Sequence, residues 1–335
     1  MTVQEKNVEY YINGLKAGNR YILSEAITLV ESTLPQKNKL GLEIISKLPS
    51  EAGRSLRIGI TGSPGVGKST FLESFGMLLI EKGFNIAILA VDPSSQKTKG
   101  SILGDKTRME QLSKDQHAYI RPTASGQMLG GIAANTREAI LLCEAAGYEI
   151  ILVETVGVGQ SETMVSHLVD IFLLLIMPGS GDDIQGIKRG IMELADIILI
   201  NKADGDRVAQ ANKSKKQFQN ALSLLQHKIE GWGPSVMTCS GLKSTGLEEV
   251  WNKINDFVQY AKGISHFEFN RDQQDKKWFE EKTRQLIHYH FMKSTEMNLL
   301  LDRLTLKIDQ KAIKTIDAII EFSNSLDAII SGKLK

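Results

Sequence analysis

The sequence predicts an α/β fold: a doubly wound, mainly parallel sheet with a helical extension at each end. Short apolar runs without polar alternation recur through the middle of the chain, as expected for strands that are buried on both faces. Stretches with helical spacing separate these runs. Such alternation is typical of a doubly wound sheet, in which ligands bind at the carboxyl ends of the strands. The runs comprise residues 58–61, 86–91, 150–153, 171–177, 197–200 and 236–238.

Composition limits the class of protein. Hydrophobic residues make up 42% of the 335 residues, enough for a sizeable core, and the formal net charge is +1. This balance gives no electrostatic argument for nucleic acid or an anionic membrane as a partner. The two cysteines, Cys143 and Cys239, predict neither a disulfide framework nor a thiolate zinc site. No apolar run is long enough for a membrane span, and the first residues lack a signal-peptide core, so we expect a cytoplasmic protein.

The pattern divides the chain into three regions. Residues 1–55 are expected to form a helical arm that lies on the central domain or on a partner, and Asn19 can cap one of its helices. Residues 56–262 form the central domain. Residues 263–335 lose the strand pattern, and we expect long helices there at 276–292 and 295–330. Their apolar stripe packs either on the same chain or on a second copy, and the pattern alone leaves both open.

The segment from Arg57 to Thr70 carries the strongest motif. Its strand breaks into glycine, and the spacing Gly-x4-Gly-Lys-Ser is that of a phosphate-binding loop. The glycines let successive N–H groups point at one anion, and the next helix adds its positive end. Lys68 can reach the β- and γ-phosphates, and the Ser69 hydroxyl can ligate Mg²⁺. We assign the nucleotide phosphates to Gly62, Ser63, Pro64, Gly65, Val66, Gly67, Lys68, Ser69 and Thr70.

A second motif predicts that the base is guanine. Asn201, Lys202 and Asp204 form the pattern Asn-Lys-x-Asp directly after a strand. A carboxylate at Asp204 accepts from the guanine ring N–H and amine, whereas adenine offers an acceptor at that ring position. Contacts of this kind discriminate between bases by roughly 1–3 kcal/mol, and the stem of Lys202 can cover the base. After the last strand, a loop whose backbone suits the guanine carbonyl comprises Ser240, Gly241 and Leu242. We therefore expect GTP or GDP as the ligand.

Acidic residues predict the magnesium side of the site. Glu154 follows a strand and can hold Mg²⁺ directly or through water, and the Gly157 N–H can contact the γ-phosphate. Asp92 and Asp105 can face the same phosphate, although both positions also fit simple turn or helix capping. Val158 stands where guanine-nucleotide switches usually carry a water-positioning glutamine. Hydrolysis by the isolated protein is therefore expected to be slow.

A glycine-rich segment at 177–188 is the last candidate. Asp182, Gln185 and Lys188 are spaced three apart and share one helical face. The segment fits a well-capped surface helix as well as a mobile loop that reaches the phosphates, and the residues alone leave both open.

These segments, together and in order, resemble the MeaB/ArgK family of methylmalonyl-CoA mutase-associated GTPases across nearly the whole chain. The resemblance is carried by residues 62–70, 92–95, 100–109, 154–163, 185–188, 192–196 and 201–206, and it is weakest in the C-terminal part. This chain departs from the family at Gly241, where the family usually carries alanine.

The resemblance implies a P-loop GTPase domain that hydrolyses GTP to GDP and phosphate. It further implies a chaperone that assists the delivery of adenosylcobalamin to a B12-dependent acyl-CoA mutase and protects that enzyme, and a homodimer formed through the C-terminal helices. Four residues would surround the metal and the attacking water: Ser69, Asp92, Asp105 and Glu154. The catalytic candidates are Lys68, Asp105, Gln185 and Lys188.

Two alternatives remain at this point. A metal-insertion GTPase would need a His/Cys metal site, and the six histidines form no such cluster in the sequence. A transport-associated kinase or ATPase would transfer phosphate to a protein or couple its hydrolysis to transport. Whether phosphate from GTP ends in water or on a protein distinguishes the kinase from the GTPase.

Overall fold

The structure is a computed structural model that describes residues 6–49, 55–92, 109–124, 131–155, 161–179, 189–223, 229 and 231–333. The chain divides into two compact units, Met1–Trp278 and Phe279–Lys335. Among the described helices, none combines the length and the apolar character that a membrane span requires.

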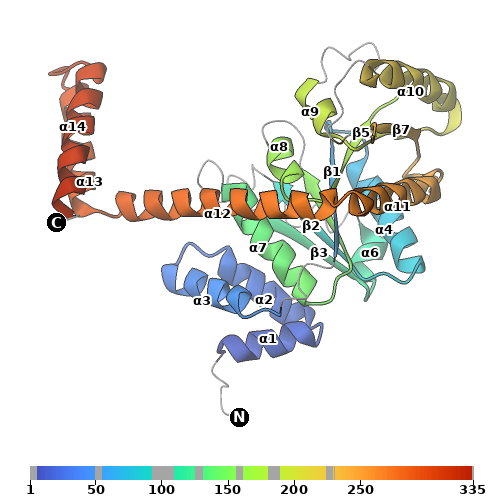
Figure 1. Cartoon of the computed structure of the whole chain (residues 1–335), viewed down its shortest axis with the longest axis horizontal. Coiled ribbons are helices and arrows are strands. Elements are labelled where there is room, and N and C mark those ends of the chain that lie inside the picture. Colours follow the sequence, from blue (N-terminus) through green and yellow to red (C-terminus); the bar gives the residue numbers. More distant parts are fainter. Residues whose placement is uncertain are drawn as a thin grey trace. The chain divides into compact units, whose positions relative to one another are not determined.

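A seven-stranded sheet forms the centre of the first unit in the described part of the chain, and all of its neighbouring strands are parallel. The strand order is β3-β2-β4-β1-β5-β6-β7, so the phosphate-loop strand β1 is central (Figure 1). This arrangement confirms the predicted doubly wound sheet. The strands are β1 (Leu56–Gly62), β2 (Ile86–Asp92), β3 (Ala118–Ala124), β4 (Ile150–Thr155), β5 (Ile171–Ile176), β6 (Ile197–Ile200) and β7 (Ser235–Thr238).

The edge strand β3 is absent from the sequence-based prediction. It contains Arg121 and Pro122, which interrupt the apolar pattern that marks the other strands. Proline cannot donate to a strand ladder and is tolerated at a sheet edge. β3 pairs with β2 over its whole length, from Ile86 opposite Ala118 to Asp92 opposite Ala124. Its place in the sheet is therefore decided by this pairing rather than by its own sequence.

Alternate residues of each strand enter cores on opposite faces of the sheet. Ile58, Ile86 and Leu152 belong to one core, which is closed by α4 (Lys68–Glu81), α6 (Glu110–Lys114) and α11 (Leu247–Gly263). The other core takes residues such as Ala87 and Val153. Burial on both faces explains why the strands read as unbroken apolar runs.

The N-terminal arm covers the second of these faces. It consists of α1 (Val8–Lys16), α2 (Arg20–Val30) and α3 (Pro35–Ser46), and it lies beside α7 (Gly131–Ala145) (Figure 1). As predicted, Asn19 caps its helix: the side-chain oxygen of Asn19 accepts from the N–H groups of Tyr21 and Ile22. Arg121 of β3 binds Glu31 at 2.5 Å and so fastens the end of α2 to the sheet edge. The arm therefore packs on its own domain.

The remaining helices differ from prediction mainly at their ends. The helix expected at 276–292 begins earlier, at His266. The helix expected at 295–330 is broken into two, with Lys311 between them in the left-handed region at a φ of 54°. The elements are α8 (Ser161–Ser166), α9 (Arg189–Leu194), the 3-10 turn η1 (Gly205–Arg207), α10 (Val208–Leu222), α12 (His266–Met292), α13 (Thr295–Asp309) and α14 (Thr315–Lys333).

In the second unit, α13 and α14 pack through a small apolar cluster. Leu300, Leu304 and Ala318 are buried there, and Lys307 binds Glu321 across the pair at 3.0 Å. Large apolar side chains remain exposed on the same helices, including Leu306, Ile316 and Ile319.

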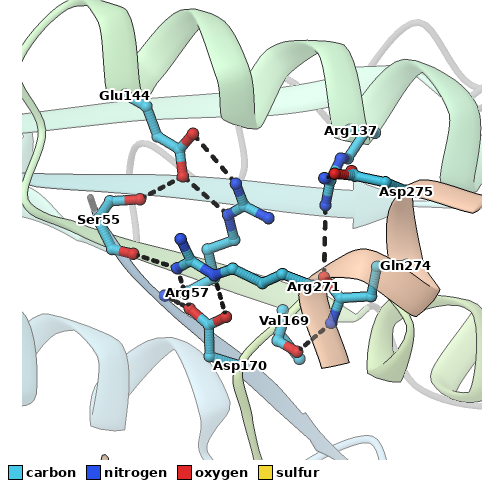
Figure 2. Close-up of polar contacts among 9 residues, drawn as sticks. All are labelled: Ser55, Arg57, Arg137, Glu144, Val169, Asp170, Arg271, Gln274 and Asp275. Atoms are coloured by element: carbon cyan, nitrogen blue, oxygen red, sulfur yellow. Dashed lines mark hydrogen bonds and ion pairs between the residues drawn. The ribbon is translucent and has the colours of Figure 1, made fainter. Parts of the chain in front are cut away.

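A buried network of charges lies at the amino end of β1, as Figure 2 shows. Arg57 is only 2% exposed, and its guanidinium binds Glu144 of α7 through Nε at 2.8 Å and Nη2 at 3.1 Å. The Ser55 hydroxyl donates to the same carboxylate at 2.5 Å. Two charge-assisted bonds in a bidentate geometry are among the stronger polar contacts available in a protein.

Asp170, just before β5, holds the second half of this network. Its carboxylate accepts from the Arg57 backbone N–H at 2.8 Å and from Arg271 of α12 through Nε at 2.8 Å and Nη2 at 2.7 Å. Arg271 also donates to the Ser55 carbonyl at 2.6 Å. Asp170 therefore ties the first turns of α12 to both β1 and β5.

Further along α12, Arg137 of α7 binds Gln274 and Asp275. Burial, and after it the positive charge of Arg57, lowers the pKa of the Arg137 guanidinium, while Asp275 opposes this. The Gln274 amide in turn donates to the Val169 carbonyl at 2.7 Å. The part of α12 up to Trp278 is thus held by polar contacts that come from three separate segments of the first unit.

Replacing Asp170 by asparagine tests this network. We expect Asp170→Asn to lower the free energy of unfolding by about 3–5 kcal/mol, because it removes the negative charge of the buried Asp170 from its pair with the partly buried Arg271. Chemical denaturation measures the loss. The control is Glu248→Gln, which removes the exposed ion pair with Lys82 (2.6 Å) and should cost less than about 1 kcal/mol. Equal losses in both variants would contradict the assignment.

Candidate nucleotide-binding site

The phosphate loop leaves the carboxyl end of β1 and leads into α4. Gly62, Gly65 and Gly67 have φ values of 154°, 78° and 93°, which L side chains rarely adopt. A Cβ on Gly62 would lie 2.5 Å from the Leu175 carbonyl oxygen of β5. Gly67 is the N-cap of α4 and has no side chain with which to cap it. The first N–H groups of the helix therefore face the loop, and this cradle fits a phosphate group.

The lysine of the motif lies over this loop. Lys68, the first residue of α4, donates from Nζ to the Gly62 carbonyl at 2.7 Å and to the Ser63 carbonyl at 3.3 Å. Ser69 and Thr70 follow in the first turn of α4, and Thr70 is exposed. The lysine and two hydroxyl residues are thus consecutive where the loop meets α4, so the residue types present fit a phosphate with a bound magnesium ion.

Asn201, directly after β6, connects the phosphate loop to the loop after β7. Its side chain is 1% exposed, and its Nδ2 donates to the Val66 carbonyl at 2.9 Å. Its Oδ1 accepts from the Gly241 N–H at 3.1 Å. The structure thus gives this side chain a role in holding the two loops together, in addition to the contact with guanine that the sequence predicts.

Cys239 adds a weaker contact to the same oxygen. Its Sγ donates to Asn201 Oδ1 across 3.7 Å. Burial raises the pKa of this thiol to about 12, so it stays protonated and able to donate at any physiological pH.

The other predicted guanine residues gather beside Asn201. Lys202 has a φ of 58°, and its Nζ donates to the Gly65 carbonyl at 2.7 Å. The Asp204 carboxylate accepts from the Ser240 hydroxyl, whose oxygen also accepts from the Lys243 N–H at 3.1 Å. Leu242 is 71% exposed. The Asn201–Asp204 segment and the loop of residues 240–242, the guanine loop below, are therefore brought side by side.

On the magnesium side, Glu154 is buried at the carboxyl end of β4 and pairs in register with Ile60 of β1. The sequence-based assignment overlooked a neighbouring contact, in which the Thr155 hydroxyl donates to Thr61 Oγ1 at 2.7 Å. This bond joins the ends of β4 and β1 below the phosphate loop. A hydroxyl residue near the end of both strands is the only hint of it in the sequence.

Several predicted site residues cannot be placed. Asp105, Gly157, Gln185 and Lys188 lie outside the described residues, and of Asp92 only the backbone, at the end of β2, is described. Among the described residues, no three His, Cys, Asp or Glu side chains form a group that could hold a metal ion by themselves. Magnesium takes oxygen ligands, of which the Ser69 hydroxyl and the phosphates of a bound nucleotide are examples.

The all-parallel sheet, the glycine cradle with its lysine and the guanine loop define a P-loop nucleotide-binding protein. Comparison with known proteins gives the family. The sequence profile described as "Methylmalonyl Co-A mutase-associated GTPase MeaB" matches residues 23–296. The chain belongs to this family, and it is a GTPase.

Individual relatives agree with this assignment. The GTPase ArgK of Escherichia coli is 45% identical over 296 residues, covering 88% of this chain and 89% of that protein. The mitochondrial methylmalonic aciduria type A homolog of Mus musculus is 43% identical over 298 residues, covering 86% of this chain and 72% of that protein. A crystal structure described as an LAO/AO transport system kinase has a TM-score of 0.76 at 35% identity, covering 98% of this chain and 100% of that one.

The bridging role of Asn201 leads to a prediction. We expect Asn201→Ala to lower the free energy of unfolding by about 1–3 kcal/mol, because the buried Val66 carbonyl and Gly241 N–H lose their partner. The affinity for GDP should fall about tenfold or more, since both loops that would contact the nucleotide lose their common support. Denaturation and nucleotide titration measure the two effects separately.

Asn38→Ala is the matched control, because Asn38 also donates its amide to a backbone carbonyl, that of Val30, at 2.8 Å. This bond lies within the N-terminal arm, so its loss should reduce stability and leave GDP affinity unchanged. If both variants bind GDP equally well, Asn201 does not support the nucleotide site.

Proposed function

We propose that this GTPase acts as a chaperone for a B12-dependent acyl-CoA mutase of the methylmalonyl-CoA mutase type. The observation that carries the proposal is the family match over residues 23–296, joined to a site whose phosphate and guanine loops are both complete in the described residues. GTP hydrolysis to GDP and phosphate would assist the delivery of adenosylcobalamin to the mutase and protect the mutase. The cobalamin belongs to the partner in this scheme, and the GTPase carries only the nucleotide. We place this function in the cytoplasm.

In this proposal the described residues bind and orient GTP. The N–H groups of the loop 62–67 and the Lys68 ammonium hold the phosphates, and Ser69 and Glu154 would hold Mg²⁺ together with Asp92 and Asp105. The ion would draw off negative charge from the phosphates as the γ-phosphate leaves. Asp204 reads the guanine N–H groups, and its hydrogen bond from Ser240 supports this role by holding the carboxylate in one orientation. Asp105, Gln185 and Lys188 remain the candidates for placing and activating the attacking water.

We further propose that the chain forms a homodimer through its C-terminal helices. The exposed apolar side chains of α13 and α14, such as Leu306, Ile316 and Ile319, support this part. An apolar surface of this kind on a small helical unit favours pairing with a second copy.

A kinase coupled to transport is the second candidate, because one similar crystal structure is described as a transport system kinase. The destination of the γ-phosphate separates the two functions. Radiolabelled GTP incubated with cell extract should release inorganic phosphate and label no protein if the chaperone proposal is right.

Guanine selectivity should depend on Asp204. We expect Asp204→Asn to weaken GTP binding by a factor of about 10 to 100, corresponding to the roughly 1–3 kcal/mol of a base-edge contact. The preference should shift toward xanthosine triphosphate, because the amide can donate to the additional carbonyl of xanthine. Competition binding with both nucleotides measures the shift. Asp206→Asn, on the exposed turn η1, is the control and should keep wild-type selectivity. A normal GTP affinity in Asp204→Asn would mean that Asp204 does not contact the guanine base.

The partner proposal predicts that the mutase accelerates GTP hydrolysis. Groups ordered or supplied by a partner can raise the rate of a P-loop enzyme by orders of magnitude. This chain has Val158 where a water-positioning glutamine usually stands, so a partner could supply or order the missing group. Purified mutase is titrated into the GTPase, and phosphate release is followed for wild type, Lys188→Ala, Gln185→Ala and the surface control Lys213→Ala. We expect acceleration in wild type and control, and its loss in one of the two loop variants.

Binding gives an independent measurement. The GTP and GDP forms should bind the mutase with different affinities, because nucleotide can shift the complex only through such a difference. Equal rates with and without mutase would reject the partner. Acceleration that survives both loop variants would keep the partner and reject the role of residues 185 and 188.

A further inference from the structure

The guanine loop touches α4 through a contact that no nucleotide-binding motif includes. Ser74 lies on α4, beyond the motif residues, and its hydroxyl donates to the Gly241 carbonyl at 2.5 Å. The Gly241 N–H donates to Asn201 Oδ1 at 3.1 Å. Both polar groups of Gly241 are therefore held, one by the helix that starts at the phosphate loop and one by the strand end that carries the guanine motif.

Glycine at 241 allows this close approach. A Cβ at this position would lie 2.8 Å from both the N and the Cα atoms of Phe71, and 3.1 Å from the carbonyl carbon of Thr70. These are backbone atoms of α4 and cannot move aside as a flexible side chain can. The guanine loop thus rests directly on the first turns of the phosphate-loop helix.

Ser74 also sets the direction of the next peptide. In a planar trans peptide, the carbonyl of Gly241 and the N–H of Leu242 point in opposite directions. Because the Ser74 hydroxyl holds the carbonyl against α4, the Leu242 N–H must point away from α4. A donor whose direction is set in this way suits an acceptor on a bound base, and guanine offers its ring carbonyl.

We propose that Ser74 is a positioning residue for base recognition. By holding the Gly241 carbonyl it aims the backbone donor of the guanine loop at the carbonyl of the base, and it couples this loop to the helix that binds the phosphates. The inference rests on the proposed recognition of guanine by Asp204 and the guanine loop, and adds to it the helix residue that orients this loop.

The three nucleotides GDP, IDP and ADP separate this role from others. GDP and IDP share the base carbonyl, and IDP lacks the amine that Asp204 would read, whereas ADP carries an amine in place of the carbonyl. We expect Ser74→Ala to lower the affinities for GDP and IDP by the same factor, about threefold to tenfold, as for the loss of one hydrogen bond. The affinity for ADP should stay as in the wild type.

Two variants complete the experiment. Ser74→Thr keeps the hydroxyl and should bind GDP with the affinity of the wild type. Ser46→Ala removes a hydroxyl that donates to the Glu43 carbonyl at 2.9 Å in the N-terminal arm and should change none of the three affinities. Thermal unfolding, followed by circular dichroism, checks that each variant is folded.

Each other outcome overturns the proposal. Equal weakening of all three nucleotides would make Ser74 a residue of the fold only, and unchanged affinities would remove it from the site. A larger loss of affinity for GDP than for IDP would mean that Ser74 acts on the contact of Asp204 with the amine instead of on the contact with the base carbonyl. A wild-type protein without preference for GDP over ADP would instead reject guanine recognition itself, which is the separate failure of the proposed function.

Discussion

Parallel pairing of the strands is the constraint on which the rest of the structure depends. Because all neighbouring strands run in the same direction, the ends of β1, β4 and β6 meet at one edge of the sheet. The phosphate loop, Glu154 and the Asn201–Asp204 segment are thereby brought together although they lie far apart in the chain. A functional residue therefore needs only to follow its own strand directly, because the parallel pairing places it beside the residues that follow the neighbouring strands. An antiparallel neighbour would send one of these groups to the opposite edge.

The functional edge is stabilised by hydrogen bonds between loops. Asn201 joins Val66 of the phosphate loop to Gly241 of the guanine loop, and the hydroxyl of Ser74 joins the guanine loop to α4. These contacts link the groups that would hold the phosphates to those that would read the base. The guanine loop is therefore connected to the phosphate loop and its helix by two side chains, Asn201 and Ser74.

The opposite edge of the sheet has a different task. There the charged side chains of Arg57, Glu144, Asp170 and Arg271 connect two strands, α7 and the start of α12. Since β1 has Arg57 near one end and the phosphate loop at the other, the same strand joins the anchor of α12 to the nucleotide site. A buried ion pair is weak evidence for net stability, because its replacement by apolar residues is often neutral or stabilising. Here these pairs specify where the first turns of α12 lie on the first unit.

Much of the fold and of the site follows from the sequence because the determining interactions are local. Strands buried on both faces must be apolar throughout, and the phosphate loop needs its glycines because Gly62, Gly65 and Gly67 adopt left-handed backbone angles. These requirements leave patterns that a single chain displays. The same holds for Asn19 at the start of α2, whose side chain caps the helix two and three residues further on.

Tertiary structure alone decided the features that depend on distant partners. The edge strand β3 carries Arg121 and Pro122 and is a strand because β2 offers it a ladder. The contact of Ser74 with Gly241 spans 167 positions, and the polar partners of Arg57, which are Glu144 and Asp170, come from two other segments. A hydroxyl on a helix or an arginine in a strand has many possible partners, and only the packed chain selects one. The sequence by itself thus determined the chemistry of the nucleotide site, whereas the folded structure determined which side chains hold that chemistry in place.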